Sequence, residues 1–282
     1  MDHTQNLSVS TSCKTAAATT WLYSYNVRYS IFLITCMCVG LPLAGWALRV
    51  LRQHRENGGK ASAFITALLL TDLLEMVLSP PMLAYLFSPV VERSWVAFVL
   101  FYSVKYCGAH LHQMVALEGA MARTGYLPPG YRKSWHIFSV FFCLIEGIFL
   151  LLCLYVYPLF SSPAFTLTWL VLAIIPLAVT CKLTVAPRVS PLSHNAGQRS
   201  SYPVLAIAAG SFFTLYGPFL AFVLAQALPP EGSVEKCQNG MLAAMTIIHP
   251  LVCLRLLADP LLCVQVVREF LLDEGPVETS SA

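Results

Sequence analysis

Seven apolar stretches, each long enough to cross a lipid bilayer, follow one another along the 282 residues of the chain. About 20 apolar residues in a helix span a hydrocarbon core that is ~30 Å thick. The chain is 57% hydrophobic and only 11% charged, which excludes an ordinary soluble domain of this length. The sequence therefore predicts an all-α protein, a bundle of seven transmembrane helices in the lipid bilayer.

The loops between these stretches are short, so we expect no separate soluble domain, and no internal repeat is visible. The seven predicted spans cover residues 25–51, 61–86, 96–122, 134–158, 165–184, 202–228 and 239–267.

Basic residues mark every second connection between the predicted spans. They are Arg49, Arg52 and Arg55; then Arg123, Arg132 and Lys133; then Lys182, Arg188 and Arg199. Because basic loops stay in the cytoplasm, the N terminus is expected outside and the C terminus inside. This divides the chain into an extracellular tail (1–24), the seven-helix bundle (25–267) and a cytoplasmic tail (268–282). Residues 268–272 of the cytoplasmic tail are predicted to lie as a short amphipathic helix on the inner leaflet.

Three residues on the predicted outer side favour this orientation. Asn6 begins an Asn-Leu-Ser sequon, which is expected to carry a glycan outside the cell. Cys13 and Cys237 are the two cysteines in polar segments, and both would lie in the oxidising compartment. We expect a disulfide between them; the alternative is two unrelated free thiols.

Charged residues inside the apolar stretches are the strongest pointer to function. A charge at the depth of Asp72, Arg255 or Asp259 is costly unless it finds a partner or lines a wet cavity. Glu75 lies three residues after Asp72, on the same helical face. We therefore expect Arg255 to contact Asp72, Asp259 or both; the alternative is a pair between Arg255 and Asp259 alone, four residues apart on their own helix.

The third span is the most polar of the seven. Lys105, Ala109, His112, Ala116 and Gly119 recur at spacings of three and four, so they share one helical face. A lipid-facing position would be costly for that face, which predicts that this span lies in the centre of the bundle.

No motif in the chain indicates catalysis. The HExxH pattern, a phosphate-binding glycine loop and a serine nucleophile elbow are all missing from the sequence. His110 and His112 point in different directions on a helix, so each is predicted to be a hydrogen-bonded core residue and not a metal ligand. We expect no enzyme activity, no metal, no cofactor and no nucleic-acid partner.

Three short segments and two single residues, one in each of the second, fourth, fifth, sixth and seventh spans, carry a resemblance to a known family. The second span contains Leu68 to Leu74 (LLLTDLL) with Pro80 downstream, which is similar to an LxxAD segment. The sixth span contains Phe212 to Pro218 (FFTLYGP), which is similar to an FxxCWxP element. The seventh span contains Asp259 to Cys263 (DPLLC), which is similar to an NPxxY element in its DPxxY form. Trp135 and Pro176 suit the tryptophan of the fourth span and the proline of the fifth. The chain thus resembles the rhodopsin-like G-protein-coupled receptors. The aspartate form, together with a link between Cys13 and Cys237, resembles the branch with nucleotide, lipid-mediator and proton-sensing members.

Several positions depart from that family. Ala122-Arg123-Thr124 keeps the arginine of the DRY motif and loses its acid, Cys263 replaces the NPxxY tyrosine, and Tyr216 replaces the tryptophan of the sixth span. The family's usual disulfide at the outer end of the third span cannot form.

The resemblance implies a receptor of the plasma membrane that binds a small extracellular ligand and activates a heterotrimeric G protein. Lys105 would favour an anionic ligand, and His249 would join it or sense protons; the alternative for Lys105 is that its side chain snorkels to the surface. Arg255 would take the place of the sodium ion that the family binds beside the equivalent of Asp72. A receptor-like decoy or scaffold that does not signal is the alternative function.

The residues that the resemblance assigns fall into three groups. Ligand contacts are expected from Tyr102, Lys105, Ala109, Tyr216 and His249; the activation relay from Asp72, Arg255, Asp259, Pro260 and Pro218; and the G-protein contact from Arg123.

Overall fold

The computed structural model describes residues 3–59, 62–87, 94–124, 129–155, 171, 174–183, 202–215 and 253–273. All regular elements within these ranges are helices, so the predicted all-α class is confirmed for this part of the chain. The helices are α1 (His3–Glu56), α2 (Ala63–Phe87), α3 (Ser94–Thr124), α4 (Pro129–Tyr155), a short helix (Ile174–Leu183), α7 (Tyr202–Leu215) and α10 (Arg255–Asp273).

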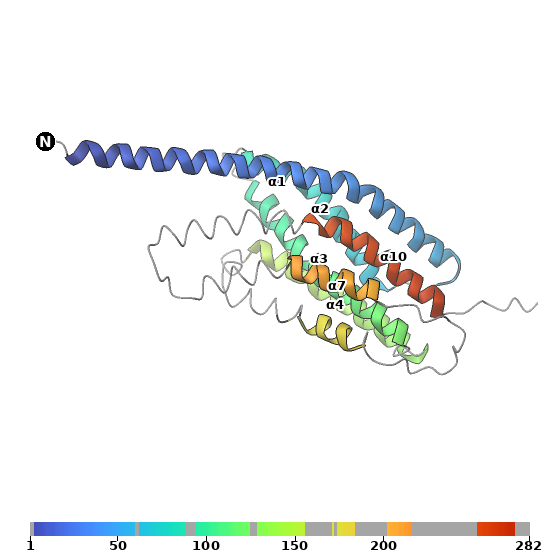
Figure 1. The fold of residues 1–282 in the computed structure, drawn as a ribbon. Helices are drawn as coiled ribbons and strands as arrows, with labels where there is room; N and C mark the ends of the chain where they lie inside the picture. Colours follow the sequence, from blue (N-terminus) through green and yellow to red (C-terminus); the bar gives the residue numbers. More distant parts are fainter. Residues whose placement is uncertain are drawn as a thin grey trace, which may run out of the picture.

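The first helix is much longer than the predicted first span. It begins at His3, and its N-terminal part extends beyond the other helices (Figure 1). The polar residues before Tyr25 led us to expect a tail there, but polarity decides which residues enter lipid and does not prevent a helix. At the other end, Gly58 ends α1 with a φ of 82°, in the left-handed conformation that glycine adopts without steric cost.

The last helix also differs from the expectation. Residues 268–272 were predicted to form a separate amphipathic helix, whereas the structure has one uninterrupted helix from Arg255 to Asp273. Neither glycine nor proline occurs between Leu261 and Asp273 to end it. Residues 239–252 of the predicted seventh span lie outside the described residues.

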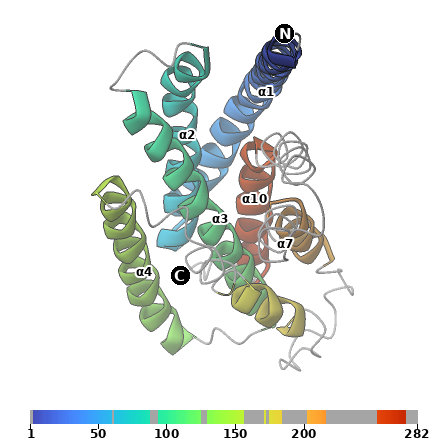
Figure 2. The same cartoon turned by 90° about the vertical axis from the view of Figure 1, so that its left-hand side faces the viewer.

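Helix α3 occupies the centre of the bundle, as its polar face predicted. It packs against α2, α4, α7 and α10 (Figure 2). Every residue from Cys107 to Ala120 is buried, and a helix buried all round must be enclosed by its neighbours. Gly119 lets α10 approach closely, since a Cβ there would lie 2.7 Å from a methyl group of Val266.

The outward faces of the helices are apolar. Exposed side chains include Ile31 on α1, Val77 on α2 and Phe141 on α4, which are 62%, 69% and 61% exposed. Two helical segments, Tyr23–Glu56 and Ala63–Ala84, are long and apolar enough to cross a membrane. Within the described residues the molecule thus places large apolar side chains outside, while Asp72, Glu75, Arg255 and Asp259 are buried.

Gly40 and Gly45 of α1 provide a matched test of how closely α1 and α10 pack. A Cβ at Gly40 would lie 2.9 Å from the carbonyl oxygen of Leu256, whereas a Cβ at Gly45 would meet nothing within 4 Å. We expect Gly40→Ala to lower the melting temperature of the purified protein, because α1 and α10 must separate, at a cost of about 1–3 kcal/mol. Gly45→Ala should leave it unchanged or raise it. Equal melting temperatures for both variants would contradict this packing.

Candidate functional site

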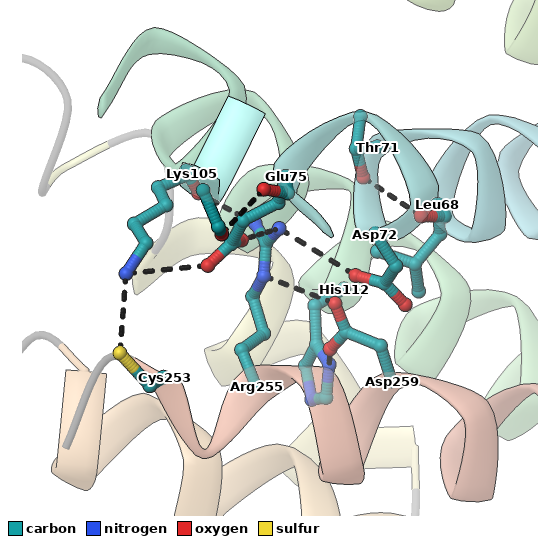
Figure 3. A network of polar contacts seen from close by, with 10 residues as sticks. Leu68, Thr71, Asp72, Glu75, Lys105, His112, Cys253, Arg255 and Asp259 are labelled. Atoms are coloured by element: carbon teal, nitrogen blue, oxygen red, sulfur yellow. Dashed lines mark hydrogen bonds and ion pairs between the residues drawn. The ribbon is translucent and has the colours of Figure 1, made fainter. Parts of the chain in front are cut away.

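Six polar side chains from three helices meet in the interior and form a charge cluster (Figure 3). None of the six is more than 3% exposed. They are Asp72 and Glu75 of α2, Lys105 and His112 of α3, and Arg255 and Asp259 of α10. Two cations face three carboxylates here, so a further proton on His112 or on one of the acids makes the cluster neutral.

The guanidinium of Arg255 is the centre of the charge cluster. Its Nη2 lies 2.8 Å from Glu75 Oε2 and 3.5 Å from Asp72 Oδ1. Its Nε lies 3.1 Å from Asp259 Oδ2, one turn further along α10. The predicted contacts to Asp72 and Asp259 are thus both confirmed, and the alternative of a pair within α10 alone is wrong.

Arg255 also bonds to the backbone of α3, and Gly108 makes this contact sterically feasible. Nη1 of Arg255 donates to the carbonyl oxygen of Lys105 at 2.6 Å. A Cβ at Gly108 would lie 1.8 Å from that same Nη1, far inside the contact distance of a carbon and a nitrogen atom that are not bonded to each other. Glycine at position 108 is therefore required for the observed position of the guanidinium.

Lys105 is buried, and its charge is matched within the protein. Its Nζ lies 3.2 Å from Glu75 Oε1, with which it forms an ion pair, and donates a hydrogen bond to the sulfur of Cys253 at 3.4 Å. The ammonium also lies over the ring of Phe101, 4.5 Å from the centroid, where a cation–π attraction adds to the ion pair. Since Lys105 is only 3% exposed, the expectation that it snorkels to the surface is wrong.

Both central histidines are hydrogen-bonded core residues, as predicted. His112 Nδ1 lies 2.5 Å from Asp259 Oδ1 and so connects α3 to α10. His110 Nδ1 lies 3.0 Å from Glu146 Oε1 and connects α3 to α4, on a different side of α3. No group of three or more histidine, cysteine or acidic side chains placed to hold a metal ion occurs among the described residues.

Three residues of the interior, Glu75, Glu146 and Cys253, have larger roles than their sequence context led us to expect. Glu75 is the one carboxylate that contacts both cations of the charge cluster. Its position one turn after Asp72 was the available signal. For Glu146 the signal was a lone carboxylate in an apolar span, which needs a partner as much as Asp72 does.

Several predicted site residues lie outside the described part of the chain. Ala109 is buried in α3 and Pro260 is buried in α10, next to Asp259. The described residues do not include Tyr216, Pro218, Cys237 and His249. For four further residues the structure describes the backbone in α1 or α3 but not the side chain: Asn6, Cys13, Tyr102 and Arg123. The structure therefore places the relay residues Asp72, Arg255, Asp259 and Pro260 together and leaves the disulfide and most of the ligand contacts as predictions.

Removing the arginine from the charge cluster should destabilise the fold strongly. Arg255→Ala leaves three buried carboxylates without their main partner, which costs about 3–5 kcal/mol. Arg52→Ala is the matched control, because Arg52 pairs with Glu56 at 2.7 Å on the surface of α1, and exposed pairs contribute little. The melting temperature and the surface expression of both variants are compared with those of the wild type. If Arg255→Ala behaves like Arg52→Ala, Arg255 does not hold the helices together.

Gly108→Ala should reproduce much of the effect of losing Arg255, because the added methyl group displaces the guanidinium from α3. We expect a lower melting temperature than for Gly147→Ala, a glycine of α4 whose Cβ would meet nothing within 4 Å. The double variant Gly108→Ala/Arg255→Ala should be less destabilised than the sum of the two single variants. Additive losses would mean that Gly108 acts independently of Arg255.

No protein-family model matches the chain, and no curated protein matches it. What the chain does must therefore follow from its own residues, above all from the charge cluster and the apolar faces around it.

Proposed function

We propose that the chain is a multi-pass receptor of the plasma membrane, of the rhodopsin-like G-protein-coupled type, with seven transmembrane helices. It binds a small extracellular ligand between its helices and activates a heterotrimeric G protein. The observation that carries the proposal is the charge cluster, which joins α2, α3 and α10 in the interior of a bundle with apolar outward faces. Burying charged side chains at membrane depth costs free energy, and such residues mark functional sites in membrane proteins.

The distribution of apolar side chains supports a membrane environment. Soluble proteins rarely expose apolar patches of more than a few hundred Å². Here α4 alone exposes a row of large apolar side chains, and α1 and α2 add others. The described helices α2, α3 and α4 correspond to the second, third and fourth predicted spans, which favours the seven-helix count over a protein with only two spans.

The charge cluster supports a mechanism in which helices move relative to one another. Arg255 has acceptors on α2, on α3 and on its own helix. It can therefore exchange partners when α10 shifts, without leaving a buried charge unpaired. A ligand that binds one arrangement better than the other shifts the population toward it.

Glu75 bears on the kind of ligand that Lys105 can bind. Because Glu75 already neutralises Lys105, an anionic ligand must draw the ammonium away from that carboxylate. The proposed ligand accordingly carries a strong anionic group, a carboxylate or a phosphate, and reaches Lys105 from the outer side of α3.

A receptor-like decoy or scaffold is the second candidate. Cys263 favours it, since it is buried at the position where the resemblance expects a tyrosine, and a thiol cannot replace the hydrogen bonds of a phenol. Ala122, which removes the acid before Arg123, favours it as well.

Nucleotide exchange separates the two candidates. The full chain is reconstituted in nanodiscs with heterotrimeric G proteins, and GDP–GTP exchange is recorded with a panel of anionic lipids and across acidic pH. The receptor should accelerate exchange, and Arg123→Ala should abolish the acceleration while the melting temperature stays unchanged. A folded protein that gives no acceleration with any G protein or ligand supports the decoy instead.

Sodium dependence tests the proposed role of Arg255. Because the guanidinium contacts Asp72 and Asp259 directly, we expect equal melting temperatures in sodium chloride and in choline chloride at the same ionic strength. A melting temperature that rises in sodium alone would show that an ion still binds beside Asp72.

A further inference from the structure

Helices α1 and α10 form an exposed surface near their C-terminal ends, which we call the α1–α10 corner. Val39, Pro42, Trp46 and Arg49 of α1 follow one another at spacings of three, four and three, so they lie on one face. All four are exposed. Arg268 of α10 completes the corner, with its guanidinium carbon 6.0 Å from the centroid of the Trp46 ring.

The two arginines of the corner have no acidic partner among the described residues. The neighbouring arginines of α1 differ in this respect. Arg52 pairs with Glu56, and Arg55 donates to the hydroxyl of Thr66 at 2.8 Å. The positive charge at Arg49 and Arg268 is therefore available to an anion from outside the chain.

The sequence of chemistries along the corner matches the parts of a phospholipid. Val39 and Pro42 present an exposed apolar surface, where an acyl chain can lie. Trp46, 39% exposed, follows at the level where tryptophan prefers to sit between hydrocarbon and water. The two guanidinium groups come last, at the end of the predicted span on the basic side of the membrane, where a lipid phosphate would be.

We propose that the α1–α10 corner is a binding site for an anionic phospholipid of the inner leaflet, such as phosphatidylserine. The phosphate and headgroup carboxylate lie between Arg49 and Arg268, and one acyl chain follows Trp46, Pro42 and Val39 along α1. Basic residues beside a membrane span attract anionic lipids in general. What makes this a site is the exposed Trp46, whose ring lies beside Arg268 of α10 and one helical turn before Arg49 of α1.

Native mass spectrometry of the full chain in detergent tests the site, with phosphatidylserine and phosphatidylcholine as probes. The wild-type protein should bind phosphatidylserine more tightly. Arg49→Gln and Arg268→Gln should each weaken that binding about fivefold, as expected for the loss of one charge near a lipid headgroup. Binding of phosphatidylcholine should change little.

Three further variants separate a defined site from general attraction to charge. Arg52→Gln removes a paired arginine of the same helix end, and Arg28→Gln removes an exposed arginine at the opposite end of the predicted span; both should bind phosphatidylserine as the wild type does. Trp46→Ala keeps every charge and should still weaken binding. The proposal would be overturned if Arg28→Gln lost as much phosphatidylserine binding as Arg49→Gln, or if Trp46→Ala bound phosphatidylserine as the wild type does. It would also be overturned if the corner variants changed the ratio of monomer to dimer without changing lipid binding.

The site rests on the proposed membrane orientation and not on signalling. Lipid binding is measured without ligand or G protein, so a chain that binds phosphatidylserine at this corner and fails to stimulate nucleotide exchange would retain the lipid site and lose the receptor function. The converse result, exchange without lipid selectivity, would remove only the lipid site.

Discussion

The guanidinium of Arg255 is the group on which the arrangement of the described helices depends. A cation held in the interior of an apolar bundle is tolerated only when carboxylates and hydrogen-bond acceptors surround it. Arg255 has both, from α2 and α3 and from its own helix. Because the three carboxylates and the carbonyl of Lys105 must converge on one guanidinium within ion-pair or hydrogen-bond distance, they fix how α10 is rotated and how deeply it lies against α2 and α3.

The glycines follow from the same constraint. Gly108 leaves the backbone of α3 open to the guanidinium, Gly119 admits Val266 of α10 further along, and Gly40 brings α1 against the start of α10. Helices in lipid gain little from burying apolar surface against each other, so close packing and polar contacts must hold them together. The charge cluster supplies the polar contacts at the centre, and these glycines supply the close packing around it.

The sequence predicted helices where α2, α3 and α4 lie, and it predicted Asp72 and Asp259 as partners of Arg255, because charges are few in these apolar spans and a lone cation has few acids to choose from. It did not predict that Glu75 would be shared between Arg255 and Lys105. Spacing assigns residues to one face of a helix, but the rotation of each helix against its neighbours decides which faces meet, and that depends on packing across the whole bundle. The continuity of α10 past Val267 and the early start of α1 were missed for a different reason: both depend on local helix propensity, which the search for apolar spans does not measure.

Glu75 links the two cations of the charge cluster. One of its carboxylate oxygens contacts Lys105 and the other contacts Arg255, so the two cations compete for a single negative charge. In the proposed receptor, an anionic ligand that attracts Lys105 leaves Glu75 to Arg255 alone and strengthens that pair relative to those with Asp72 and Asp259. Lys105 also offers its carbonyl oxygen to Arg255, so a displacement of α3 at this residue reaches the guanidinium through the backbone as well. The coupling between the outer side of α3 and α10 therefore needs no long chain of contacts, because one carboxylate and one peptide carbonyl already connect them.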